Sequence, residues 1–560
     1  MRTEPTAQEI DEPRKLVGVF SATQTDNLRW LFTSLERVFA VRFEQAGSVD
    51  PKRLDGALVL GVKHAGQAPS GIPRLVLRSG PRARERPLAA EQTAVVISED
   101  DALARPLRGA QIIENAALGD LPLPLPDSGR MLASAERRAV WWQSGEAPAA
   151  LCVSAYPLAE LREGEALRDH LRPGCFMQLL PLLHFLGLLL GAGAETLPPL
   201  RASFVIDDPN LHWPTYGFLK YGDMVDHASE HRYHVALATV PFDGWLVNRR
   251  AASLIRENPS ALSLLMHGND HVARELGRLS DRDAEPSIAQ ALRRIAALER
   301  RSGVTVDRAM APPHGACSEA ALRAMFRLGI EAACVSRPYP WRDGLPAPTP
   351  LAGWRPAEMV AGGLPVLPRH SLSLSREDLV FRALLGQPLI LYGHHQDFAD
   401  GLDLFAQAAG DINRLGDVRW GSLSEIAHRN YTTRRAGEIL HVGMHARRIS
   451  IEVPDGVRAL HVQVQEPLGG AAWRKLSHPG GAEDTAFRGG MGETRLESIA
   501  APCRVDLALC ADHPLDPTQG ARRGRRPWPL MRRVMVEGRD RIQPLLPRGA
   551  GSKAQSRGGR

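Results

Sequence analysis

The stretch Phe204-Val-Ile-Asp207-Asp208-Pro209-Asn210 joins a short apolar strand directly to two neighbouring carboxylates. Adjacent residues at the end of a strand point in different directions, so one carboxylate can bind a cation while the other stays free as a base. Asp-Asp pairs are also common at loop starts and helix N-caps. The pair therefore indicates a site only if other reactive side chains follow strands nearby.

Three further stretches place reactive side chains after apolar strands. The strand ending at Met266 is followed by His267-Gly-Asn-Asp-His271, whose two histidines can converge on one cation if the chain turns there. Pro312-Pro313-His314-Gly315 is typical of a tight, rigid turn. Leu389-Ile-Leu-Tyr392-Gly393-His394-His395 is a buried strand ending in two histidines. The sequence does not say which of these two histidines points into a cleft.

The region around these stretches alternates short apolar strands with helix-like runs. Strands are predicted at 203–206, 235–239, 262–266, 332–335 and 389–391, and helices at 286–302 and 319–328. This rhythm predicts an α/β fold, a (β/α) barrel over residues 201–432. In such barrels the chemistry lies where the strands end, which is where all four stretches lie.

In their order and spacing, the four stretches resemble the motifs of the polysaccharide deacetylases, the NodB-homology carbohydrate esterases. Phe204-Val-Ile-Asp207-Asp208 is similar to the family's T-F-D-D, and His267-Gly-Asn-Asp-His271 to its H-[ST]-x-x-H. Ala311-Pro-Pro-His-Gly315 is similar to R-P-P-Y-G, and Leu391-Tyr-Gly-His394 to L-x-x-H. The resemblance implies a barrel of the deacetylase type and leaves both flanking regions outside it.

The resemblance also implies roles for individual residues. Asp208, His267 and His271 would bind a divalent metal, zinc first, with cobalt, nickel or manganese as alternatives. Asp207 would be the general base and His394 the general acid. One carboxylate and two imidazoles leave open positions at a cation for water and for an acyl oxygen, so this ligand set suits hydrolysis.

The family pattern is broken at two positions. Ala311 stands where the family has an arginine that orients the catalytic aspartate, so another residue must supply that charge. Arg201, Arg355 and Arg369 are the candidates. Gly268 stands where serine or threonine is usual, which removes a side-chain hydrogen bond but keeps both metal ligands.

Substrate contacts are predicted from residues beside these motifs. His314, His395, Trp213 and Tyr392 are the candidates, and the backbone N–H near His314 could stabilise an oxyanion. Aromatic residues in the loop 209–221 either stack on a sugar ring or pack within the fold.

Both flanking regions have patterns of their own. A polar leader over 1–14 precedes strand and helix signals over 15–150, which predict an open α/β domain. Residues 151–200 form a connector with an apolar run at 177–192, predicted to be a buried helix because it is shorter than a membrane span. Alternating apolar residues over 435–515 predict a small β-sandwich.

The net charge of +6 comes from the end of the chain. Residues 521–560 contain 12 basic and two acidic residues, so this segment carries +10 and the rest of the chain −4. The segment 516–560 is predicted to be a disordered basic tail, and contact with an anionic surface is the alternative. Because aromatic residues do not alternate with the basic ones, no nucleic-acid partner is expected.

The remaining features bear on the compartment. Six cysteines without a C-x-x-C pair indicate scattered thiols, and the polar, acidic N-terminus lacks the pattern of a signal peptide. No transmembrane segment is expected. The sequence therefore predicts a cytoplasmic protein.

The four stretches and their resemblance to the polysaccharide deacetylases imply a metal-dependent hydrolase that removes an N- or O-acyl group from a carbohydrate or glycoconjugate. The alternative is a catalytically degenerate barrel that binds a carbohydrate or a partner protein, which the missing motif arginine favours. A third possibility is a metal hydrolase acting on another amide or ester.

Overall fold

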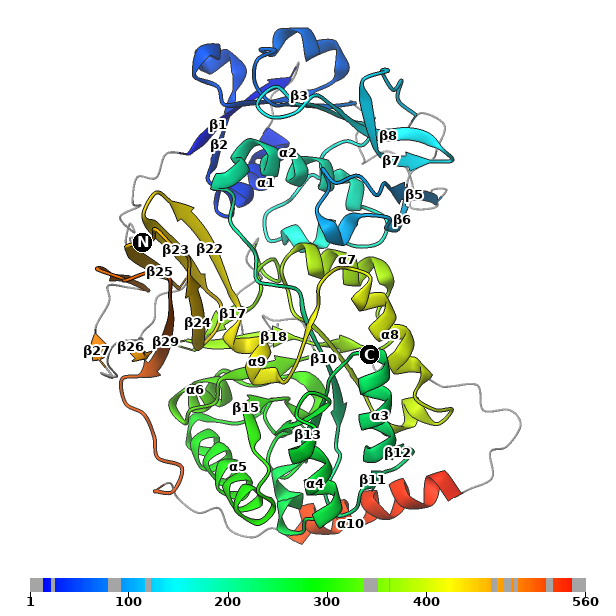
Figure 1. The fold of residues 1–560 in the computed structure, drawn as a ribbon, viewed down its shortest axis with the longest axis vertical. Helices are drawn as coiled ribbons and strands as arrows, with labels where there is room; N and C mark the ends of the chain where they lie inside the picture. The colour runs from blue at the N-terminus through cyan, green and yellow to red at the C-terminus, as the bar shows by residue number, and fades with distance from the viewer. Residues whose placement is uncertain are drawn as a thin grey trace.

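The structure is a computed structural model. It describes residues 14–21, 26–78, 92–115, 122–272, 274–336, 351–361, 363–464, 471–477, 485–487, 492–519 and 527–545. The described chain is mixed α/β with several sheets (Figure 1). Residues 1–13 of the predicted leader and 546–560 of the predicted tail lie outside the described residues.

A nine-stranded sheet forms the N-terminal part of the molecule. Its order is β2 (Val41–Gln45), β1 (Lys15–Ser21), β3 (Gly56–Leu60), β4 (Arg74–Leu77), β9 (Leu151–Ser154), β8 (Arg138–Ser144), β7 (Gly129–Ala135), β5 (Thr93–Ile97), β6 (Gln111–Glu114). The first five strands are parallel, and the pairs from β9 to β6 are antiparallel. Helix α1 (Arg29–Glu36) connects β1 to β2 and buries Leu31 and Leu35.

The apolar run of the connector forms helix α2 (Leu180–Leu190), which packs against this sheet (Figure 1). A side chain at Gly56 of β3 would meet Leu189 Cδ1 at 3.0 Å, so glycine lets the helix approach the strand closely. Within the described part of the chain, we find no helix with the length and apolar character that crossing a membrane requires.

A ten-stranded sheet forms the central part. Its order is β17 (Glu358–Val360), β18 (Leu364–Pro368), β16 (Ala332–Val335), β15 (Val306–Met310), β14 (Leu262–Met266), β13 (Val235–Thr239), β10 (Arg201–Asp207), β20 (Leu389–Gly393), β19 (His370–Ser371), with β21 (Arg419–Trp420) also pairing with β10. All pairs are parallel except β17 with β18. Among the described strands no pairing joins the two ends of this path, so the sheet does not show the closed barrel that the sequence predicted.

Helices surround this sheet. They are α3 (Tyr221–His231), α4 (Arg249–Glu257), α5 (Asp281–Ser302), α6 (Glu319–Arg327), α7 (Arg376–Leu384), α8 (Asp403–Asn413) and α9 (Leu423–His428). Every residue of β10 and β13 is buried, as expected of strands in a parallel sheet that is covered on both faces. Because parallel strands end at one edge of the sheet, the residues that follow β10, β14, β18 and β20 meet there.

Two four-stranded sheets follow the central part. One has the order β22 (Tyr431–Ala436), β23 (Ile439–Met444), β25 (Ala459–Gln463), β28 (Glu493–Leu496), and the other β24 (Arg448–Val453), β29 (Cys503–Ala511), β26 (Ala471–Ser477), β27 (Thr485–Phe487). Buried residues alternate along β23 and β24, so each strand turns one face inward.

The prediction of a disordered tail over 516–560 is wrong for part of that segment. Helix α10 (Pro527–Ile542) lies across the end of the central part, near α4 and β11 (Thr215–Tyr216) (Figure 1). Glu537 accepts a hydrogen bond from Asn210, and Arg533 pairs with Asp243. A charge count along the sequence does not reveal these long-range contacts, which hold the helix in place.

Candidate metal centre

Asp208, His267 and His271 meet at the edge of the central sheet. Asp208 Oδ1 lies 2.8 Å from His271 Nε2 and 3.6 Å from His267 Nε2. Each residue offers one ligand atom, and the three atoms lie within 4.8 Å of one another. The structure thus brings together the three residues that the sequence singled out as ligands.

The backbone around the two histidines is held in an unusual turn. Asp208, Gly268 and His271 have φ values of 72°, 65° and 55°, in the left-handed region. A Cβ at Gly268 would lie 2.6 Å from Glu275 Oε2 and 2.7 Å from Pro313 Cγ. This crowding, together with the positive φ, explains why position 268 is a glycine.

Glu275 stabilises this turn through hydrogen bonds. It was not among the site residues predicted from the sequence. Its carboxylate accepts hydrogen bonds from the backbone N–H groups of Asn269 (3.0 Å), Asp270 (2.7 Å) and His271 (3.0 Å). The signal available in the sequence was a carboxylate four residues after the second histidine, which alone is too common to indicate a role.

The ring of His267 is oriented as a metal ligand requires. Its Nδ1 lies 2.8 Å from the carbonyl oxygen of Ala311, so Nδ1 donates its proton there and Nε2 keeps its lone pair. Burial lowers the pKa of His267 to about 4, although Asp207 and Asp208 act in the opposite direction. A neutral imidazole results, and one carboxylate oxygen with imidazole nitrogens is a donor set that fits zinc and similar divalent ions.

Asp207, the neighbouring carboxylate, is paired with Arg369. Arg369 Nη1 lies 2.6 Å from Asp207 Oδ1, and both side chains are almost completely buried. Burial by itself raises the pKa of the Asp207 carboxyl, but Arg369 and His267 outweigh burial and hold the pKa below its ordinary value. Arg369 also lies 4.5 Å from the ring centre of Tyr392, which supports the guanidinium from one face.

Three arginines are candidates to replace the missing motif arginine. Of these, Arg369 is the one that pairs with Asp207. Arg201 instead donates to the Asn430 side chain and to the carbonyl oxygens of Pro199 and Gly386. Arg355 does not line the cavity that holds Asp207, whereas Arg369 does.

The cluster opens into a cavity of about 390 Å³. Its lining residues are Asp207, Asp208, His267, His271, His314, Gly315, Ser336, Arg369, Tyr392 and His394. The cavity therefore includes both predicted catalytic residues and two of the four predicted substrate contacts, His314 and Tyr392. His394 is exposed at the end of β20, and its backbone N–H donates to Asp397 Oδ2 at 2.8 Å.

His395 and Trp213 lie outside this cavity. The ring of His395 is fully buried, packs against Tyr216, and has its Nε2 3.4 Å from Asp540 Oδ1 of α10. It offers no surface to a substrate, which corrects that expectation and leaves His394 as the histidine in the cleft. Trp213 is half exposed, and Arg541 of α10 lies 4.6 Å from its ring centre.

Helix α10 also reaches the metal cluster. Arg532 Nη1 lies 2.9 Å from His271 Nδ1, and Arg532 also donates to the His271 carbonyl oxygen. Arg533 Nη1 lies 3.9 Å from Asp208 Oδ1 and Arg533 Nε 3.2 Å from Asp243 Oδ1. Because a guanidinium can only donate, His271 Nδ1 accepts in this arrangement and its proton lies on Nε2, facing Asp208. Binding a cation through Nε2 therefore requires the other tautomer of His271, with its proton on Nδ1, and a shift of Arg532 away from that nitrogen.

No protein-family model matches the sequence, and no curated protein matches it. Several solved structures are similar to part of the chain. A Mycobacterium smegmatis protein described as a polysaccharide deacetylase is 13% identical, with a TM-score of 0.29 over 42% of this chain and 90% of that one. A family 4 carbohydrate esterase from Streptomyces lividans is 10% identical, with a TM-score of 0.23 over 39% of this chain and 86% of that one. A polysaccharide deacetylase from Bacillus cereus is 10% identical, with a TM-score of 0.24 over 41% of this chain and 94% of that one.

Proposed function

We propose that this chain is a metal-dependent hydrolase that removes an N- or O-acyl group from a carbohydrate or glycoconjugate. The observation that carries the proposal is a single cavity holding an Asp-His-His cluster beside a second, buried carboxylate that is ion-paired with Arg369. The order of the four motifs along the chain, which resembles the polysaccharide deacetylases, supports the choice of a sugar acyl group.

Asp208, His267 and His271 would hold the cation, with zinc as the first choice for one oxygen and two nitrogen donors. When bound, the cation would supply Lewis acidity, polarising an acyl carbonyl and lowering the pKa of water.

The protein's own groups divide the proton transfers between them. Asp207 accepts the proton of the attacking water, because Arg369 keeps its carboxylate ionised and fixed in orientation. His394 stands on the exposed side of the cavity and donates a proton to the departing amine or alcohol. Tyr392 and His314 line the same cavity, where the sugar would lie.

Metal content and acetate release test this proposal together. We expect the wild type to bind about one equivalent of zinc and to release acetate from N-acetylglucosamine oligomers or O-acetylated sugars only when metal is present. His267→Ala and His271→Ala should lose the metal, whereas Asp207→Asn should keep the metal and lose turnover. His64→Ala, which changes a half-buried histidine of the N-terminal part, is the matched control and should retain both.

Two outcomes would contradict the proposal in different ways. Metal bound at the cluster without acetate release from any acylated sugar would favour a non-catalytic carbohydrate-binding protein. Full metal content in both histidine variants would remove this cluster as the metal site.

A further inference from the structure

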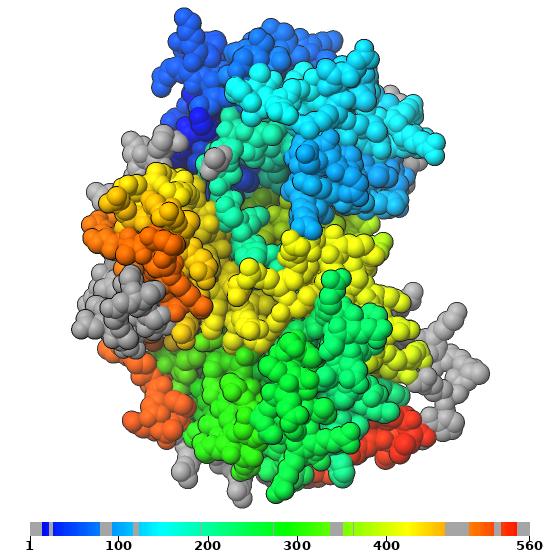
Figure 2. All heavy atoms as spheres, in the orientation of Figure 1, coloured from blue at the N-terminus to red at the C-terminus, as the bar shows by residue number. Residues whose placement is uncertain are grey.

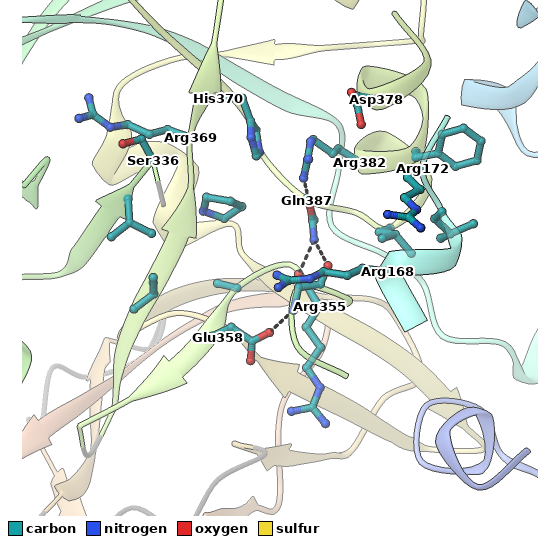
Figure 3. A pocket seen from close by; sticks show the side chains of 18 of the residues that line it. Arg168, Arg172, Ser336, Arg355, Glu358, Arg369, His370, Asp378, Arg382 and Gln387 are labelled. Carbon is teal, nitrogen blue, oxygen red and sulfur yellow. Dashed lines mark hydrogen bonds between the residues drawn. The ribbon is translucent and has the colours of Figure 1, made fainter. Parts of the chain in front are cut away.

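A second cavity, of about 340 Å³, lies where the connector meets the central part (Figure 3). The connector contributes Arg168 of the short helix Leu167–His170 and the nearby Arg172. The central part contributes His370 of β19 and Arg382 of α7. Arg369 and Ser336 line both this cavity and the metal cavity, so the two lie next to each other.

Three polar side-chain atoms of the residues that line this cavity are buried without a partner among the described residues. They are Arg382 Nε, Arg369 Nε and His370 Nε2. Arg382 uses Nη1 to donate to Gln387 Oε1 at 3.2 Å, and Gln387 in turn donates to the carbonyl oxygens of Gly353 and Arg355 (Figure 3). Buried polar groups are normally satisfied, so unpartnered polar atoms indicate that a ligand or water completes them.

The charges in this cavity favour an anion. Asp378 and Glu358 also line it, but Asp378 accepts from Ser375 Oγ at 3.0 Å and Glu358 from the Gly353 N–H at 2.7 Å. The third carboxylate, Asp169, comes no closer than 3.8 Å to Arg168. Burial lowers the pKa of Arg382, and the like charge of Arg168 lowers it further while Asp378 opposes both.

We infer that this cavity is a binding site for a small molecule bearing a phosphate or carboxylate group, held by Arg168, Arg172 and Arg382. Guanidinium forks match the geometry of both anions, and the cavity volume suits a molecule of about sugar size. The inference goes beyond the proposed hydrolysis, because binding here needs neither metal nor turnover.

Calorimetric titration of the full-length protein with inorganic phosphate and with glucuronate tests the site. We expect at least one probe to bind, and binding to weaken by about tenfold or more in Arg168→Gln and in Arg172→Gln. Arg458→Gln removes an exposed arginine of the C-terminal sheets and should bind as the wild type does. Tighter binding of phosphate or of glucuronate would identify which anion the site prefers.

Two results would overturn this site: binding of neither probe at millimolar concentration, or equal affinity in the arginine variants and the control. Zinc content, measured on the same samples, should stay unchanged in every variant. A loss of anion binding is therefore distinguishable from a failure of the metal cluster.

A separate observation concerns helix α10, whose polar side faces the protein and whose apolar side faces outward. Its inward contacts are made by Arg533, Glu537 and Arg541. Trp528, Met531, Val534, Met535 and Ile542, by contrast, are each 56–64% exposed. Trp528, Met531, Met535 and Ile542 recur at helical spacing and so form one stripe along the helix. Helix α10 itself lies at the lower end of the molecule in Figure 2.

We propose that this stripe docks the protein on an anionic lipid surface. The helix lies in the segment 521–560, which carries 12 basic and two acidic residues, so its charge is complementary to anionic headgroups. Exposed apolar side chains, tryptophan included, in a segment rich in basic residues are typical of helices that lie in the membrane interface. Since Arg532 contacts His271, this docking would bring the metal cavity close to the membrane.

Cosedimentation with vesicles tests the docking surface. The full-length protein should bind phosphatidylcholine–phosphatidylglycerol vesicles and not phosphatidylcholine alone, and Met531→Glu/Met535→Glu should weaken binding by about tenfold or more. Val62→Glu, at an exposed valine of the N-terminal part, is the matched control and should bind normally. Equal binding to both vesicle types, no binding at all, or an unaffected double variant would overturn the proposal.

Discussion

Asp207 and Arg369 form an ion pair whose side chains are only 5% and 1% exposed. Removing one partner leaves the other charge buried without compensation, so we expect Arg369→Gln to lower the free energy of unfolding by about 3–5 kcal/mol. The double variant Asp207→Asn/Arg369→Gln should lose less than the sum of the two single variants. Urea unfolding of all four proteins in EDTA measures this coupling without a contribution from metal.

An exposed pair provides the control for this cycle. Arg458 Nε lies 3.1 Å from Glu438 Oε1, and the two side chains are 76% and 66% exposed. Removing either partner should change the free energy of unfolding by no more than about 1 kcal/mol. Strictly additive costs at Asp207 and Arg369 would show that the buried pair does not act as a unit.

Glu114, at the end of β6, ties the N-terminal sheet to the segment that leads into α2. Its carboxylate is 1% exposed, and Oε1 accepts the Met177 N–H at 3.0 Å. Burial raises the pKa of Glu114 from 4.5 to about 7, although backbone hydrogen bonds oppose the rise. The folded state therefore favours the protonated carboxyl.

This shift gives stability a defined pH dependence. Because the folded pKa lies above the unfolded one, the contribution of Glu114 is complete below pH 4.5 and is lost as pH rises through about 7. The loss is on the order of 3 kcal/mol. Glu114→Gln should remove this part of the pH dependence in urea unfolding, whereas Glu438→Gln, at an exposed position, should follow the wild type.

The N-terminal and central parts of the molecule are joined by a stacked aromatic pair. Phe176, just before α2, and Phe381 of α7 have ring centres 3.6 Å apart and nearly parallel planes, and both are buried. Phe381→Ala should cost about 3–5 kcal/mol and weaken the coupling between the two parts. In calorimetry we expect one wild-type transition to separate into two, while Phe381→Leu should preserve a single transition. An unchanged melting profile in Phe381→Ala would contradict this role.

The sequence pointed to Asp208, His267 and His271 as candidate ligands through a resemblance of motifs, with Asp207 beside them, and the structure brings these side chains together. Each follows a strand that its own apolar run predicts, and parallel strands bring their ends to one edge of the sheet, so local patterns determine the cluster. Gly268 could be read only as a departure from the family, because the crowding by Glu275 and Pro313 that requires it exists only in the folded turn.

The partners of this cluster depended on contacts between residues distant in the sequence. Arg369 is 162 positions from Asp207, so the sequence could list it only as one of three candidates. Arg532 is 261 positions from His271, and the basic composition of its segment gave no sign that α10 would reach the cavity. The turn after β20 buries His395 and leaves His394 in the cleft. His395 is buried because Tyr216 and Asp540, both distant in the sequence, pack against it. Periodicity and motif spacing reflect the geometry within one helix or strand. The contacts of Arg369, Arg532 and His395 instead depend on which surfaces pack together once the whole chain has folded.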